Sequence, residues 1–122
     1  MRLLAVCKKM LFVLAIASPI FLLSFSPAGY EKPKVLVFSK TEGFRHASIE
    51  AGKKAFEKMA AEKGFTVDFT EDAGRFTNAV LKQYHAVVFL NTTGDVLNNE
   101  QQEEFERYIQ AGSGYLGIHS AT

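Results

Sequence analysis

The residues best suited to chemistry in this chain of 122 residues are two histidines that follow apolar runs. His46 closes the polar segment 40–46, which comes directly after an apolar run at residues 34–39. His119 follows a second apolar run, at residues 114–118, and small residues come after it. Imidazole exchanges protons near neutral pH and also binds metal ions. We therefore predict that His119 and His46 are catalytic, as general acid/base groups or as metal ligands.

Five further side chains could bind a small polar ligand beside these histidines. An aromatic ring and a guanidinium come directly before His46, and amide, hydroxyl and carboxylate groups follow a third apolar run. The candidate substrate-binding residues are Phe44, Arg45, Asn91, Thr93 and Asp95. Asp95 also joins the two histidines as a candidate ligand set for a divalent metal, because such ions accept imidazole and carboxylate ligands.

Each candidate also has a purely structural interpretation. The alternatives are a helix cap by His46 near Ser48, a local ion pair between Arg45 and Glu42, and turn formation by Thr93 and Asp95. The third histidine, His85, precedes its apolar run and so falls at the opposite edge of the predicted sheet. We expect a structural role for it.

Apolar runs alternate with amphipathic segments after residue 33, which is the pattern of a parallel α/β fold. Predicted strands cover residues 34–39, 65–70, 85–91 and 114–119, and predicted helices begin near Ser48, Thr77 and Asn98. Right-handed crossovers give a flavodoxin-like sheet of order 2-1-3-4, with helices on both faces and a switch point between the first and third strands. The three polar segments then share the carboxyl edge, with the first and fourth strands about 10 Å apart.

Capping residues and apolar spacing define the predicted helices. Ser48 is the expected N-cap of the first helix, which ends at Gly64. Asn98 and Gln101 form an expected capping box for the last helix, which ends at Gly112. The side chains expected to face the core are Ile49, Phe56, Met59 and Ala60 in the first helix, Val80, Leu81 and Tyr84 in the second, and Phe105, Tyr108 and Ile109 in the last.

Residues 1–28 have the pattern of an export signal. A basic start with Arg2, Lys8 and Lys9 precedes an apolar stretch, and small residues up to Ala28 offer a cleavage site. We expect a signal peptide over 1–28, a short linker over 29–33 and one domain over 34–122. The protein would then be periplasmic or secreted, with no stable membrane association after cleavage. An uncleaved N-terminal anchor is the alternative.

Composition excludes several classes of function for the exported part. The single cysteine of the chain, Cys7, lies in the expected signal, so the domain offers no thiol nucleophile. Loss of the basic start leaves a slightly acidic chain with both signs interleaved, and no basic stripe indicates nucleic-acid binding.

Three motifs in this order resemble the ThuA-like (trehalose utilisation) family. They are the segments 41–46 and 90–95 and the stretch from Glu100, Gln101 and Gln102 to residues 114–122. The resemblance implies a class I glutamine amidotransferase-like fold and a link to trehalose and related disaccharides. It places His46 and His119 at the family's two histidine motif positions. The family's domain is about twice as long, so the chain is expected to be an N-terminal fragment of it.

The resemblance leaves two interpretations of function. In one, the chain is an enzyme-like domain acting on a trehalose-type disaccharide or its oxidised derivative, with a divalent metal as a possible cofactor. In the other, it is a non-catalytic carbohydrate-binding or accessory module for a sugar-dehydrogenase or cytochrome partner, as fusions in secreted members suggest. Glutamine amidotransfer is excluded, because His119 stands where those enzymes carry their cysteine.

Overall fold

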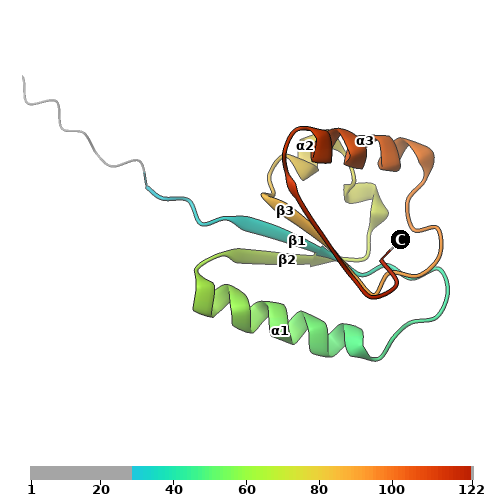
Figure 1. Ribbon diagram of the computed structural model, residues 1–122, viewed down its shortest axis with the longest axis horizontal. Helices are drawn as coiled ribbons and strands as arrows, with labels where there is room; N and C mark the ends of the chain where they lie inside the picture. The colour runs from blue at the N-terminus through green and yellow to red at the C-terminus, as the bar shows by residue number, and fades with distance from the viewer. Residues whose placement is uncertain (1–28, 122) are drawn as a thin grey trace, which may run out of the picture.

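A single parallel sheet with helices on both faces forms the fold, and the computed structural model describes residues 29–121 of it. Its elements in chain order are β1 (Lys34–Phe38), α1 (Ser48–Lys63), β2 (Thr66–Thr70), the 3₁₀ helix η1 (Ala73–Arg75), α2 (Asn78–Leu81), β3 (Ala86–Leu90), α3 (Asn99–Gln110) and β4 (Gly114–Ile118). The strand order is β2-β1-β3-β4 and every pair is parallel, as predicted. Figure 1 shows α1 on one face and α2 with α3 on the other.

The central strands β1 and β3 supply most of the core because both of their faces are covered. Along β1, Leu36, Val37 and Phe38 have no exposed surface. Val37 packs in one cluster with Phe56 of α1, whereas Leu36 and Phe38 belong to the cluster under α2 and α3. Each fully buried side chain of this size contributes about 1.5–3 kcal/mol. A run buried on both faces therefore fixes these strands at the centre of the sheet.

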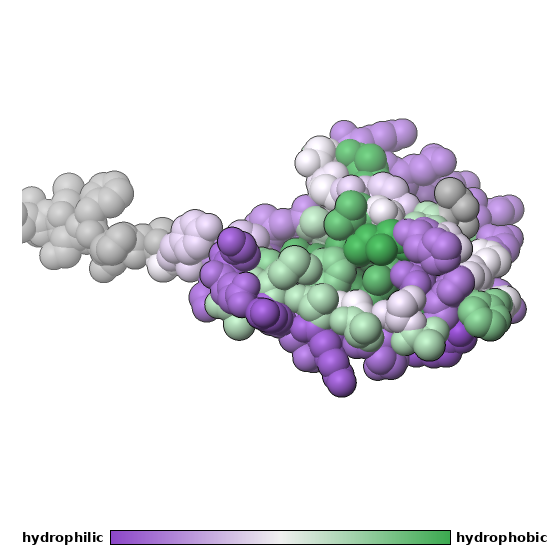
Figure 2. Space-filling view, turned by 60° about the horizontal axis from the view of Figure 1, so that its bottom comes forward, coloured by the Kyte–Doolittle hydropathy of each residue, from purple (hydrophilic) through white to green (hydrophobic). Residues whose placement is uncertain are grey.

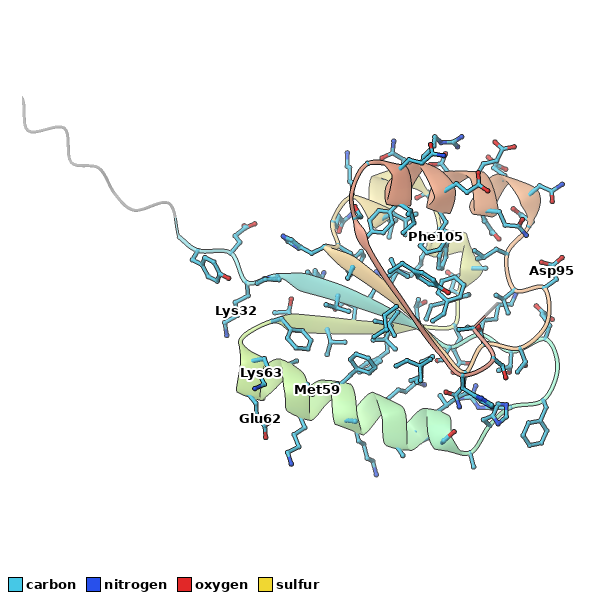
Figure 3. All side chains as sticks on the ribbon, in the orientation of Figure 1. Lys32, Met59, Glu62, Lys63, Asp95 and Phe105 are labelled. Carbon is cyan, nitrogen blue, oxygen red and sulfur yellow. The ribbon has the colours of Figure 1, made fainter. Side chains whose placement is uncertain are left out.

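Helix α1 differs from its prediction at two positions. Ser48 is its first residue and not its cap: Ala47 is the N-cap, and no side chain caps this end. Met59, expected in the core, is 39% exposed on the helix surface (Figure 3). The predicted end is confirmed, because Gly64 adopts a left-handed conformation (φ 77°) that only glycine adopts at little cost.

The helices on the other face are held by local hydrogen bonds. The Asn98–Gln101 capping box of α3 is confirmed, with both bonds at 2.9 Å. Helix α2 is shorter than expected, a single turn that follows η1, although Leu81 and Tyr84 are buried as predicted. Phe105 points from α3 toward the sheet (Figure 3) and stacks on Phe89 of β3 at 5.2 Å between ring centroids.

The two outer strands differ in character. In β2, Asp68 binds the ammonium of Lys34 at 2.9 Å and accepts a hydrogen bond from Tyr84 at 2.7 Å. In β4, Tyr115 and Leu116 are 47% and 49% exposed, and within the described residues β4 pairs with β3 alone. Figure 2 shows apolar side chains gathered in the middle of one face, bordered by hydrophilic ones.

The expected signal peptide and its Cys7 lie outside the described residues. No helix between residues 29 and 121 has the length and hydrophobicity needed to cross a bilayer.

Candidate functional site

The two candidate catalytic histidines lie side by side at the carboxyl edge of the sheet. The ring centroids of His46 and His119 are 4.6 Å apart, and their planes meet at 74°. His46 is half-buried and His119 is exposed. Among residues 29–121, His85 is the only histidine whose ring takes part in a hydrogen bond. The first and fourth strands are predicted to lie about 10 Å apart. The loop after β1 therefore extends far enough to bring His46 to His119.

Backbone contacts fix the loop that carries His46. Thr41 forms an isolated parallel bridge with Thr93, and the amide of Glu42 donates to the carbonyl of Thr93 at 2.8 Å. The hydroxyl of Thr93 donates to the carbonyl of Phe44 at 2.9 Å. The loop after β1 is thus tied to the loop after β3. Thr93, a candidate ligand-binding residue, uses its hydroxyl to hold the segment that precedes His46.

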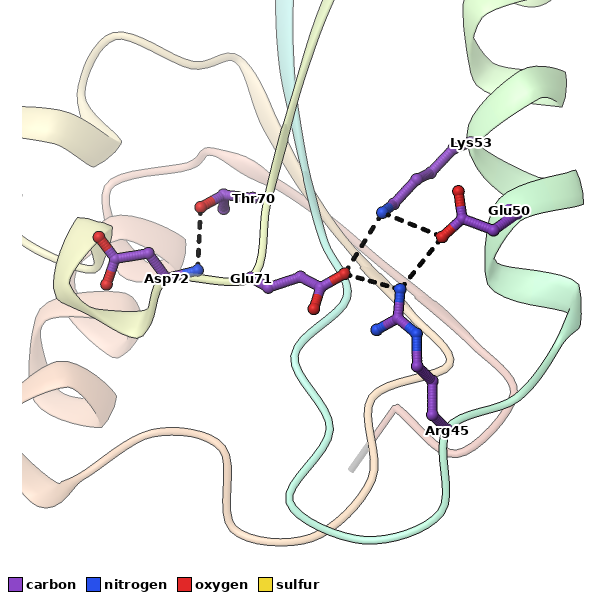
Figure 4. Close-up of polar contacts among 6 residues, drawn as sticks. All are labelled: Arg45, Glu50, Lys53, Thr70, Glu71 and Asp72. Carbon is purple, nitrogen blue, oxygen red and sulfur yellow. Dashed lines mark hydrogen bonds and ion pairs between the residues drawn. The ribbon is translucent and has the colours of Figure 1, made fainter.

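A ring of four charged side chains holds the same loop from the other side (Figure 4). The guanidinium of Arg45 lies 2.9 Å from Glu71 and 3.1 Å from Glu50. Lys53 contacts the same two carboxylate oxygens at 3.3 and 3.4 Å. The pair of Arg45 with Glu42, the structural alternative for Arg45, is not formed: Glu42 binds Lys40. The ring connects the loop to α1 and to the end of β2.

The charges in this ring shift each other's proton affinity. The hydrogen bond from Arg45, which outweighs partial burial, lowers the pKa of the Glu71 carboxyl below its usual range. The hydrogen bond to Glu71 raises the pKa of the Arg45 guanidinium. Both groups are therefore charged at neutral pH. The guanidinium of Arg45 is already bound by two carboxylates, so it serves the protein's own structure at this position.

Backbone geometry holds His119. This residue has φ 53°, in the left-handed region that few residues other than glycine adopt. Two hydrogen bonds fix the turn after it: the buried Thr92 hydroxyl donates to the carbonyl of Ser120 at 3.1 Å, and Tyr115 donates to the carbonyl of Ala121 at 2.8 Å. Left-handed residues after strands present side chains at many active sites. His119 is presented in this way.

Asn91 occupies the matching position at the end of β3. It also has φ 53° and is 5% exposed. Its side-chain amide donates to the hydroxyl of Ser48 at 2.7 Å, and its backbone amide donates to the carbonyl of Ile118 at 3.0 Å. Asn91 therefore joins the start of α1 to the end of β4. Its amide supports the two segments that carry the histidines.

Asp95 lies on the loop between β3 and α3 (Figure 3). Its carboxylate is 3.4 Å from the side-chain amide of Gln102. Asp95 lines a cavity of about 570 Å³ beside α3, together with Phe89, Phe105 and Tyr115. Among the described residues, no three His, Cys, Asp or Glu side chains come close enough to hold a metal ion. The candidate metal set is therefore reduced to two histidines.

Phe44 lies beside His46. Its ring is 72% exposed and lies edge-to-face on His46, with centroids 4.9 Å apart. His85 lies at the amino-terminal edge, where its Nδ1 accepts the backbone amide of Lys34 at 3.1 Å, as its structural interpretation predicts. The site therefore contains two imidazoles and an exposed ring. The imidazoles can exchange protons with a ligand, and the ring of Phe44 can pack against the ligand's apolar face.

Three supporting residues have roles that the sequence does not predict: Thr92, Glu71 and Ser48, the last of which is expected as a helix cap. Thr92 is 1% exposed, a burial that its place in a polar segment does not suggest. Thr92, Ser48 and Glu71 bond partners 28, 43 and 26 residues away. No local sequence pattern indicates bonds over such separations.

The parallel sheet and the histidine pair at its carboxyl edge define an α/β protein with its candidate site outside the strand ends, the usual place for a ligand in such folds. Residues 34–122 match the model of the ThuA family, described as trehalose utilisation. The match covers more than half of the chain, and the chain belongs to this family. A comparison with curated proteins gave no match.

A solved structure supports the family assignment. The chain is similar to a ThuA-like protein from Bacteroides uniformis, with a TM-score of 0.64 and 29% sequence identity. The similarity covers 78% of this chain and 40% of the solved one. The chain thus spans less than half of the length of that relative. The flavodoxin-like fold predicted from the sequence is confirmed.

Proposed function

We propose that the chain contributes a histidine pair to a site that acts on a sugar, a trehalose-type disaccharide or its oxidised derivative. The observation that carries the proposal is the 4.6 Å contact between His46 and His119 at the carboxyl edge. Membership of a family described as trehalose utilisation supports this substrate class. In this role one imidazole accepts a proton from a sugar hydroxyl while the other donates one.

The interactions that position the imidazoles of His46 and His119 favour a catalytic role over a packing role. His119 keeps a left-handed backbone, and its loop is fixed on both sides. His46 follows a residue bound by two carboxylates. General acid/base catalysis requires groups held within hydrogen-bonding reach of the proton they transfer. Two imidazoles held from different segments meet this requirement once a sugar lies across them.

The test follows the histidine signals and the sugar together. Trehalose, its oxidised derivative and maltose are titrated into the full chain while the imidazole NMR signals and the sugar spectrum are recorded. We expect trehalose-type ligands to shift the signals of His46 and His119 and leave His85 unchanged. Turnover, where it occurs, is lost in His119→Asn and His46→Asn and kept in His85→Asn. Equal shifts with every sugar, or none, would contradict the proposal.

A second candidate is a carbohydrate-binding or accessory module for a sugar-dehydrogenase or cytochrome partner. The exposed ring of Phe44 supports it, because sugars stack their apolar faces on aromatic rings. The chain contains no tryptophan, so the stacking surface is small. Phe44→Ala separates the two: it abolishes sugar binding in a stacking module, whereas in an acid/base site it weakens binding and leaves turnover measurable.

Export is part of the proposal. The pattern of residues 1–28 supports cleavage at or near Gly29, which makes the product periplasmic or secreted. Mass spectrometry of the exported protein should give a first residue at or near Gly29. A membrane fraction that retains residues 10–25 would instead support an N-terminal anchor.

A further inference from the structure

The two histidine rings have a spacing that suits a shared metal ion. In a tetrahedral Zn²⁺ site with Zn–N distances near 2.0–2.1 Å, two imidazole rings have centroids about 5 Å apart. The ring centroids of His46 and His119 are 4.6 Å apart, and the ring planes meet at 74°. The spacing of the two rings is therefore close to that of two imidazoles on one ion.

Paired charges lie near this point. Three cations of the adjoining loop and helix are bound by carboxylates: Lys40 by Glu42, and Arg45 and Lys53 by Glu50 and Glu71. These pairs reduce the positive charge that would oppose an incoming ion. The site is also open to solvent, since His119 is exposed.

The donor atoms select the kind of ion. Imidazole nitrogen suits Zn²⁺, Ni²⁺ and Cu²⁺, whereas Mg²⁺ and Ca²⁺ prefer oxygen ligands. Asp95, the carboxylate that the sequence offered as a third ligand, is bound to Gln102 beside α3. Two protein ligands leave at least two positions of a tetrahedral ion to water or to a ligand's oxygens.

We propose that His46 and His119 together bind one first-row transition-metal ion through their imidazole nitrogens and leave its other coordination positions open. The ion would lie where the proposed sugar site is, but its binding does not depend on a sugar. The metal alone is therefore the probe. If no metal binds, the metal proposal fails, whereas the proposed sugar site is still tested separately by the sugar titration with a chelator present.

The chain offers an internal control, because it contains only three histidines and His85 lies at the opposite edge. Ni²⁺, Zn²⁺ and Mg²⁺ are titrated calorimetrically into the full, untagged chain carrying Cys7→Ser, which removes the only thiol. The same titrations use His46→Asn, His119→Asn and His85→Asn. Asn is chosen because it tolerates the positive φ of position 119.

We expect one Ni²⁺ or Zn²⁺ per chain, no heat with Mg²⁺, and affinity at least about tenfold lower in His46→Asn and His119→Asn. His85→Asn should bind as the parent does. Far-UV circular dichroism checks that each variant is folded. As a second measurement that needs no variant, Cu²⁺ should broaden the imidazole NMR signals of two histidines and spare the third. Absence of binding, equal loss in all three variants, or broadening of all three histidines would overturn the proposal.

Discussion

His46 and His119 reach the same place by different means. His46 lies on a loop that backbone and side-chain bonds to Thr93 hold on one side and the charged ring around Arg45 holds on the other. His119 follows a strand directly, and its direction comes from a left-handed backbone and a bonded turn. A position held by exposed charges responds to salt and acid, whereas one held by backbone geometry does not. We call the half of the site that carries His46 the adjustable half and the half that carries His119 the rigid half.

The two outer strands, β2 and β4, differ in polarity. Charged and polar groups occupy β2, which lies under the ring, and they suit an outer strand. Apolar residues occupy β4, which leads to His119, and two of them are half exposed. The rigid histidine therefore depends on a strand that pairs on one side only within residues 29–121.

The largest expected effect concerns that open edge. Residues 29–122, expressed alone, should self-associate through β4, because an exposed apolar edge can pair with a second strand. Leu116→Lys should shift the protein toward monomer in light scattering. Met59→Lys, which changes an exposed residue of α1, is the matched control and should leave the assembly unchanged. A parent protein that is a monodisperse monomer would contradict the prediction.

The next effect compares neighbouring threonines that support different halves. Thr92→Val removes a partly buried hydrogen bond to the carbonyl of Ser120, which should cost about 1–3 kcal/mol of unfolding free energy. Thr93→Val acts on the more accessible carbonyl of Phe44, which water can reach, and should cost less than about 1 kcal/mol. Urea unfolding measures both. Equal losses would remove the distinction between the halves.

A third prediction tests the backbone of His119 itself. His119→Val places a β-branched residue at φ 53° and should destabilise the protein by about 1–2 kcal/mol relative to His119→Asn. Thermal or urea unfolding of the two variants gives the difference. Val as stable as Asn at this position would show that the left-handed backbone is not retained.

The smallest effect concerns the charged ring. The pKa of Glu71 is lowered in the folded state, so its contribution to stability is complete above the usual carboxyl pKa and is lost as the pH falls through the folded value. Acid below about pH 4.5 should therefore destabilise the parent more than Glu71→Gln. Glu62→Gln, an exposed carboxylate of α1, is the control and should follow the parent. Added salt should reduce the difference between parent and Glu71→Gln at neutral pH.

The sequence predicts what depends on neighbours along the chain. The four strands follow from apolar runs, and the capping box of Asn98 and Gln101 follows from residues three apart. Strand order places His46 and His119 at the same edge of the sheet, and the course of the loop after β1 brings their rings into contact. The partner of Arg45 does not, because Glu71 is 26 residues away and Glu42 is the nearer carboxylate. Ser48 likewise looks like a cap until Asn91 is brought to it by the sheet.

The order of the strands also sets the order in which the site can be made. The chain is synthesised from β1 outward, and β1, β2 and β3 already form a sheet that can hold the loop of His46. His119 follows the last strand, β4, which reaches its place only after α3 has crossed the sheet. The loop of His46 thus precedes, along the chain, the strand that carries His119 into place. Contact between the two imidazoles requires β4 to be paired with β3, so a spectroscopic signal of that contact would time the docking of β4.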